Sequence, residues 1–123
     1  IKANGDDGVT ISRMDRCLVA FPFNKWHEIE TKILSMAEKS AKMRRFRRVF
    51  IGGAFECNCD KQDRILIPPS LRQYAALDKE IVLVGVLDHF EIWSRDNWEN
   101  ENKVQEEDMQ EEEVRNEIAR LGI

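Results

Sequence analysis

The sequence has 123 residues, of which 42% are hydrophobic and 34% are charged, and its formal net charge is -4. These values fit one soluble globular domain with a real core. No apolar run approaches the roughly 20 residues that cross a bilayer, which excludes a helical membrane-spanning protein. The three cysteines are an odd number, which favours reduced thiols and a cytoplasmic setting over a disulfide framework.

The net charge hides a division between a body and a tail. Residues 99–123 carry nine acids and three bases, or -6, which leaves +2 for residues 1–98. A slightly basic body can attract anions, so the total charge does not exclude a nucleic-acid partner.

The first predicted elements are a β-hairpin and a helix. Residues 9–21 predict two strands, because β-branched and apolar residues flank a polar turn at residues 14–16. Pro22 stands where a first helical residue would, and apolar residues at helical spacing predict a helix that continues to Lys39.

A second helix is predicted from Ser40, which can act as its cap, to the pair Gly52 and Gly53. It carries the sequence MRRFRR. The arginines of this cluster could attract phosphate or could lie on a solvated or subunit-interface face, and the residues favour the second interpretation. They are Arg44, Arg45, Arg47 and Arg48.

Residues 54–59 have a hydrophobic period of two, which predicts a strand. A short strand is expected at 65–67, and it must end at Pro68 and Pro69 because proline cannot donate to a β ladder. Ser70 is then expected to cap a brief helix.

The last predicted elements repeat the first. Residues 81–93 predict a second hairpin, and Ser94 is expected to cap a closing helix. Residues 10–26 and 82–98 share one order: strand, Asp-containing turn, strand ending in an aromatic residue, capping position, and a Trp four residues later. A duplicated unit explains this order, and its first copy would then need about two dozen further residues before Ile1.

Asp60 and Arg64 are the candidate binding residues, four positions apart at the entrance to the predicted 65–67 strand. In the functional interpretation, a turn presents the arginine to a phosphate or a guanine edge and Asp60 orients it. In the structural alternative, an exposed salt bridge joins two strand ends and contributes at most about 1 kcal/mol. From the residues alone the structural alternative is the stronger.

Other reactive residue types give little support to a metal centre or an enzyme. Cys57 and Cys59 share a strand face without a nearby histidine or second cysteine pair, so core cysteine is expected. His27 and His89 lie far apart and lack an evident nucleophile. We therefore expect no enzyme, no metal and no cofactor.

Two tryptophans and the tail complete the set of candidates. Trp26 and Trp98 fall in first helical turns and are expected to be hydrophobic anchors rather than base-stacking platforms. In the tail, Val114, Ile118 and Leu121 have helical spacing and predict one short docking stripe.

The motifs above resemble those of one family. The stretch GAFECNCDKQDRILIPPSLRQYAALDKEIVLVGVLDHFEIWSRDNW resembles the second half of an MraZ protein, and DRCLVAFPFNKWHEIETKI resembles the later part of the first half. The resemblance implies an α+β fold of the AbrB, MazE and MraZ type, namely a duplicated swapped-hairpin β-barrel with flanking helices. It also implies a bacterial transcriptional regulator of the division and cell-wall gene cluster, which forms rings on repeated DNA sites.

The resemblance also implies roles for individual residues. The family has two D-x-x-x-R copies, of which the first would precede Ile1, so the chain is expected to be N-terminally truncated. Asp60 and Arg64 match the second copy, with Arg64 and Lys61 as DNA-binding residues and Asp60 as support. Asp63 stands where the family usually has glycine, and in a left-handed backbone it would cost of order 1 kcal/mol.

The resulting expectations are a partial first repeat with two helices at 1–50, a second repeat at 51–98 and an acidic helical tail at 99–123. The expected partners are double-stranded DNA and further copies of the chain, without a membrane or a small-molecule substrate, in the cytoplasm and at the nucleoid. The alternative is an antitoxin-like interaction module of the same fold, whose acidic tail wraps a basic partner.

Overall fold

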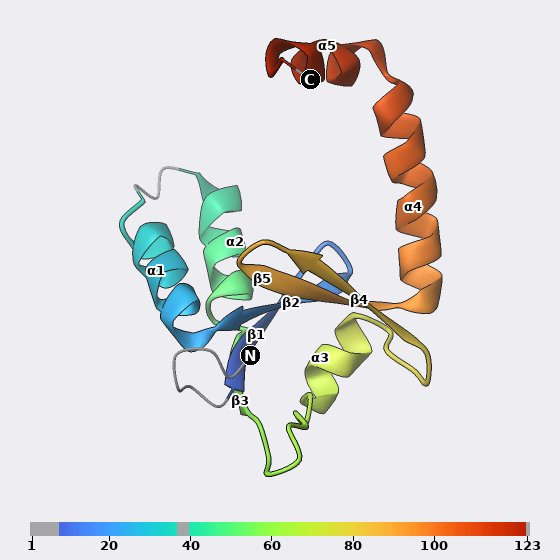
Figure 1. Ribbon diagram of the computed structural model, residues 1–123. Coiled ribbons are helices and arrows are strands. Elements are labelled where there is room, and N and C mark those ends of the chain that lie inside the picture. Colours follow the sequence, from blue (N-terminus) through green and yellow to red (C-terminus); the bar gives the residue numbers. More distant parts are fainter. Residues whose placement is uncertain (1–7, 37–39, 123) are drawn as a thin grey trace.

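The computed structural model describes residues 8–36 and 40–122, which form an antiparallel sheet with helices against both faces and a helical tail (Figure 1). This is an α+β fold, as the sequence predicts. The elements are β1 (Gly8–Met14), β2 (Cys17–Pro22), α1 (Phe23–Leu34), α2 (Ala41–Phe50), β3 (Phe55–Asn58), α3 (Pro69–Tyr74), β4 (Ile81–Val86), β5 (His89–Ser94), α4 (Arg95–Gln110) and α5 (Glu112–Arg120). None of these helices combines the length and apolar character needed to cross a membrane.

Both predicted hairpins are confirmed, and both have two-residue turns. Asp15 and Arg16 connect β1 to β2 with φ angles of 54° and 69°, the double left-handed geometry that suits the twist of a tight hairpin. Leu87 and Asp88 connect β4 to β5, so His89 belongs to the strand rather than to the turn.

The two hairpins pair through their second strands, which gives five strands in the order β3-β1-β2-β5-β4. Leu18 lies opposite Ile92 and Ala20 opposite Phe90, so β2 and β5 run antiparallel at the centre. β3 pairs with β1, far from the hairpin that follows it in the chain. Segments from the two halves of the sequence therefore share one sheet.

Alternate residues of the strands supply two hydrophobic clusters, one on each face of the sheet. The first cluster packs under α3 and consists of Val9, Ile11, Leu18, Ala20, Cys57, Leu71, Ala75 and Ile92. The second packs under α1 and α2 and consists of Cys17, Val19, Phe21, Trp26, Phe50 and Trp93. Short helices therefore cover the apolar side chains on both faces of the sheet.

The predicted closed barrel is wrong for the described residues. β3 and β4 occupy the two ends of the strand order and do not pair with each other, so the sheet is open. Closure into a barrel requires every strand to have a partner on both sides, and these two edge strands each have one.

Three element boundaries also differ from expectation. The predicted 65–67 strand is reduced to a single bridge between Cys59 and Ile65. Pro68 is the N-cap of α3 and Pro69 its first residue, so Ser70 lies inside this helix. Proline suits a first helical position because its missing N–H would have no partner there. α1 ends at Leu34, and the predicted extension to residue 39 runs into a segment outside the described residues.

The two halves repeat one packing detail that the sequence order predicts. The Phe21 and Trp26 rings lie 5.8 Å apart after the first hairpin, and the Trp93 and Trp98 rings lie 5.5 Å apart after the second. In each half, a contact between two aromatic rings therefore packs the helix, α1 or α4, against the strand that precedes it, β2 or β5. The anchoring role predicted for both tryptophans is consistent with this geometry.

Candidate nucleic-acid interface

Residues 61–63 form a tight three-residue loop between Asp60 and Arg64, and this turn connects β3 to the Ile65 bridge. The Asp60 N–H donates to the Arg64 carbonyl at 2.8 Å, and the Asp63 N–H donates to the Asp60 carbonyl at 3.1 Å. Asp63 has a φ of 61°, in the left-handed region. A turn closed by one left-handed residue is the usual form of a three-residue hairpin loop, and Asp63 occupies the left-handed position here.

The Asp60 carboxylate organises this loop from inside. Its Oδ1 accepts the backbone N–H groups of Gln62 and Arg64 at 2.8 and 2.9 Å, and its Oδ2 accepts Nε of Arg64 at 2.9 Å. The Arg64 N–H, the Gln62 N–H and the Arg64 guanidinium together hold the pKa of Asp60 below its usual range. Asp60 is therefore an anion at neutral pH and fixes both the loop and the base of the Arg64 side chain.

Arg64 projects from the loop into solvent. Its side chain is 72% exposed, against 44% for Asp60. Only Nε is used by Asp60, and within residues 8–36 and 40–122 the two terminal nitrogens have no hydrogen-bond partner. A guanidinium held at its base and open at its fork can bind a phosphate or the O6 and N7 atoms of guanine. Lys61 is exposed in the same loop and adds a second cation.

Both interpretations of the Asp60 and Arg64 pair fit this geometry. The pair is a salt bridge between two exposed groups, which contributes little to stability. The open fork of Arg64 contributes nothing to that salt bridge, so it remains available to a ligand.

The loop is held at both of its ends. Cys59 and Ile65 form the bridge at its base, and Ile65 and Ile67 pack against the cluster under α3. The chain then enters α3, where Leu71 is completely buried. Arg64 is therefore carried on a turn tied to the core, although the regular strand predicted behind it is absent.

The arginine cluster of α2 does not join this site. Figure 1 shows α2 next to α1, whereas the loop between β3 and α3 lies at the far end of the sheet. The two basic features predicted from the sequence are thus separate surfaces.

Of the two cysteines predicted to be core residues, Cys57 lies in the cluster under α3, whereas Cys59 belongs to neither cluster. Cys17 and Cys57 are buried, Cys59 is half-buried, and all three thiols are free. Burial, followed by the charge of Glu91, raises the pKa of the Cys17 thiol to about 12, so this thiol stays protonated at neutral pH.

The histidines also lie apart from the loop. His89 stacks on Phe21 at 4.6 Å between ring centroids and contacts the Asp88 carboxylate at 2.8 Å, whereas His27 is exposed on α1. In the part of the chain that the structure describes, no three His, Cys, Asp or Glu side chains are grouped to hold a metal ion.

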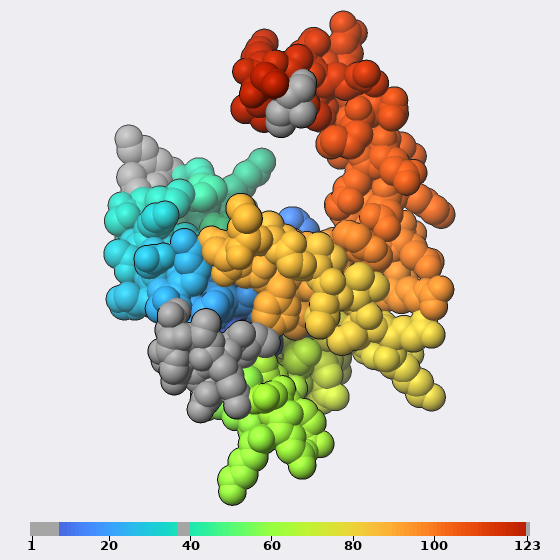
Figure 2. All heavy atoms as spheres, viewed as in Figure 1, coloured from blue at the N-terminus to red at the C-terminus, as the bar shows by residue number. Residues whose placement is uncertain are grey.

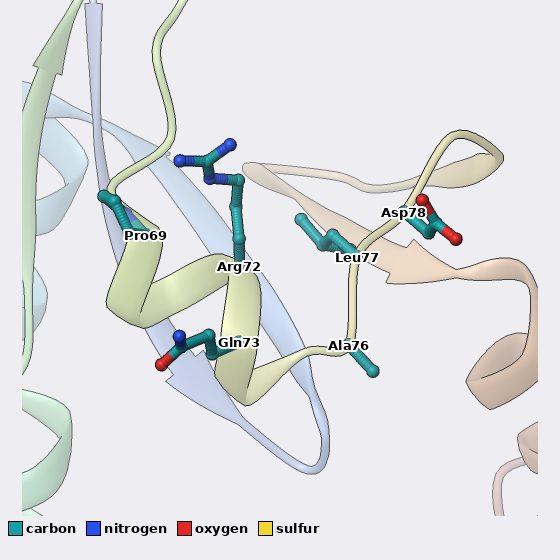
Figure 3. A pocket seen from close by; sticks show the side chains of 6 residues that line it. All are labelled: Pro69, Arg72, Gln73, Ala76, Leu77 and Asp78. Atoms are coloured by element: carbon teal, nitrogen blue, oxygen red, sulfur yellow. The ribbon is translucent and has the colours of Figure 1, made fainter.

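A shallow cleft of about 460 Å³ lies between α3 and the loop that follows it (Figure 3). Figure 3 shows Arg72 extending from α3 while Asp78 lies on the loop, with Leu77 between them. Ligand pockets are enclosed and mainly apolar, and this groove is at the surface and of mixed charge. It is lined by Pro69, Arg72, Gln73, Ala76, Leu77 and Asp78.

The structure also shows a positioning residue that the sequence did not indicate. Asn97 donates from Nδ2 to the carbonyls of Arg16 and Ala75, at 3.2 Å each. It thereby ties α4 to the first hairpin turn and to the end of α3. Its partners are 81 and 22 positions away, so no local pattern could reveal this contact.

Comparison with known sequences places the chain in a family. Residues 50–120 match the family model described as "MraZ protein, putative antitoxin-like". A "Transcriptional regulator MraZ" of Desulforapulum autotrophicum is 65% identical over 96 residues, which are 78% of this chain and 64% of that protein.

Two further relatives of the same name extend this likeness. The protein of Desulfosudis oleivorans is 50% identical over 120 residues, 97% of this chain and 82% of its own length. The protein of Desulforamulus reducens is 47% identical over 92 residues, 75% of this chain and 65% of its own length. The chain thus spans less than two thirds of two of these three relatives, and by these matches it belongs to the MraZ family.

Proposed function

We propose that the chain is part of a sequence-specific DNA-binding regulator of the bacterial division and cell-wall gene cluster, which acts as a ring-like oligomer on repeated DNA sites. The observation that carries this proposal is the Arg64 fork, exposed on a turn that the Asp60 carboxylate holds in place. The name "Transcriptional regulator MraZ", shared by its relatives, supports a regulatory and non-enzymatic role in the cytoplasm, at the nucleoid.

The proposal includes two swapped repeats, at 1–50 and 51–98, followed by the acidic tail at 99–123. Its support is the pairing of β3, from the proposed second repeat, with β1 of the first, where Val9 lies opposite Cys57. An approximate twofold relation between the hairpins would place the first repeat's counterpart of β3 on the free edge of β4. The longer relatives have room for such a segment.

One loop supplies few contacts, so single-site binding through Arg64 and Lys61 would be weak. Several copies on repeated sites convert the later contacts into intramolecular ones and raise the overall affinity. The same arrangement makes binding depend on both oligomer formation and the spacing of the DNA sites.

The test is Arg64→Ala in the intact protein, titrated against its own upstream DNA by gel shift at several salt concentrations. We expect weaker binding and a salt dependence whose slope falls by about 1 for each lost phosphate contact per binding unit. Arg72→Ala is the matched control, because Arg72 is also exposed but lies in the groove beyond α3. Light scattering should show one oligomer size for all three proteins.

An Arg64→Ala protein that binds as tightly as its parent at every salt concentration would contradict the proposal. The Asp60 pair would then be structural, and DNA contact would need another surface.

The second candidate is the antitoxin-like interaction module, favoured by the charge of the tail, which is -6 over residues 99–123. In that case Arg64→Ala should leave transcription of the target cluster unchanged, whereas deletion of the tail should abolish capture of a basic protein partner.

A further inference from the structure

Helix α2 presents a basic outer surface, which we call the α2 surface. Residues 40–53 include five cations and no acid. On the inner side, Phe46 and Phe50 stack at 5.3 Å, and Phe50 lies 5.2 Å from Trp26 in the core. The opposite side must therefore face outward. The α2 surface consists of the exposed residues Lys42, Arg44, Arg45 and Arg48.

The α2 surface concentrates like charge. Arg45 and Arg48 are three positions apart, a spacing at which equal charges on a helix repel. Arg45 and Arg48 have no ion-pair partner among the described residues. Acids brought from outside would remove this repulsion.

The tail has the opposite character and a fixed starting direction. Arg95 at the start of α4 contacts Glu80 at 2.6 Å, and the Ser94 hydroxyl caps the helix by accepting the Asn97 N–H at 3.1 Å. From Lys103 to the end of α4 every side chain is exposed. Figure 1 shows α4 projecting from the sheet with α5 turned across its end, and Figure 2 shows open space between α5 and the body.

Most acids of the tail form no ion pair with any residue that the structure describes. Within the described residues, Glu99 pairs with Arg95 and Glu117 with Arg120, at 3.2 and 2.7 Å. The other seven form no ion pair there, and we call them the tail acids: Glu101, Glu106, Glu107, Asp108, Glu111, Glu112 and Glu113.

Apolar side chains are also exposed near the charges of both surfaces. Val104, Met109 and Leu121 are exposed on the tail, with Leu121 at 74%. On α2, Val49 is exposed next in sequence to Arg48. A DNA backbone would use the arginines but leave these apolar groups in water, whereas a helix with acidic and apolar residues would cover both.

We propose that the tail acids of one copy dock on the α2 surface of a second copy. Because α4 is held at its base and leads away from the sheet, the partner is a second copy rather than the chain's own α2. The contact joins two different surfaces, so it is heterologous and can be repeated from copy to copy. It goes beyond the proposed function by naming paired surfaces for self-association, and it does not require DNA binding.

The first test is the double charge reversal Arg45→Glu with Arg48→Glu in the full chain. We expect the dissociation constant for self-association, measured by light scattering or sedimentation without DNA, to rise by at least about tenfold, because like charges now face each other. The matched control reverses two exposed cations elsewhere, Arg72→Glu with Lys79→Glu, and should leave it unchanged.

A rescue separates charge pairing from misfolding. The tail variant Glu106→Arg with Glu113→Arg should also self-associate poorly. Mixed with the α2 variant, it should restore assembly, because each acidic surface now meets a basic one. Assembly of either variant at parental affinity, or failure of the mixture to assemble while both variants keep the parental melting curve, would overturn the proposal.

Cross-linking identifies the occupant. Copies labelled with light or heavy nitrogen are mixed and treated with a carbodiimide, which joins Lys42 to a nearby carboxylate. We expect peptides that join a light Lys42 to a heavy tail acid. If the Lys42 links join only peptides of the same isotope, the tail docks on the α2 of its own chain. If no Lys42 link forms and the α2 variant binds DNA more weakly, the α2 surface is a DNA-binding surface. Either result overturns the proposed docking between copies. Neither result decides whether Arg64 binds DNA, which the Arg64→Ala titration tests separately.

Discussion

Asp63 has a backbone conformation that favours glycine over the residue present. Its φ of 61° lies in the left-handed region, where any side chain beyond glycine is strained. Asp63→Gly should raise the free energy of unfolding by up to about 1 kcal/mol, measured by urea denaturation. The gain comes from relief of strain, since the turn itself keeps its hydrogen bonds.

Asp63→Ala is the control for this prediction, because it removes the same carboxylate but keeps a Cβ. Its free energy of unfolding should be lower than that of the glycine variant by about 1 kcal/mol. Equal stabilities of the two variants would mean that the carboxylate, and not the backbone angle, determines the effect.

Much of the candidate site follows from local sequence, for a physical reason. The spacing of Asp60 and Arg64 predicts a turn, and the structure forms it with bonds that span at most four residues. The Ser40 and Ser94 caps are local in the same way and are confirmed, with hydroxyls that accept N–H groups three residues later.

At the scale of elements, prediction fails where distant parts of the chain decide the outcome. Residues 65–67 have strand composition, but only Ile65 finds a partner, because the chain must turn away to start α3 at Pro69. Leu66 is 83% exposed as a result. The sequence could not reveal this, since strand formation depends on which neighbour is within reach.

A contact between β1 and the end of α2 illustrates such a distant partner. Ser12 is completely buried, and its hydroxyl donates to the Phe50 carbonyl at 2.6 Å across 38 positions. Phe50 is the last residue of α2, where carbonyls lack partners within the helix. The serine therefore caps the helix from the neighbouring sheet.

Ser12→Ala should destabilise the protein by about 1–3 kcal/mol, because it leaves the buried carbonyl without a donor. Ser70→Ala is the comparison, since Ser70 is exposed within α3. Urea denaturation of both variants measures the difference. If both variants lose the same stability, another donor must replace the hydroxyl.

At the scale of the whole molecule, the outer strands of the two hairpins are unequal. β3 pairs with the outer side of β1, whereas within the described residues no strand pairs with the outer side of β4. β4 is also apolar, and its Leu83 side chain is 62% exposed. An open apolar edge of this kind is a site for adding another strand.

This asymmetry leads to a prediction about a chain extended at its N-terminus by the corresponding segment of a longer relative. If the counterpart of β3 lies on β4 there, amides in residues 81–86 should exchange with deuterium much more slowly in the extended chain than in this chain. Residues 9–13 of β1 are the internal control, because β3 pairs with the first part of this strand and β2 with all of it, so their exchange should be similar in both. Comparison must be made at equal oligomer size, since association through β4 would also slow exchange. Equal protection of β4 in both proteins would show that the added segment packs elsewhere and that β4 stays an edge strand of the open sheet.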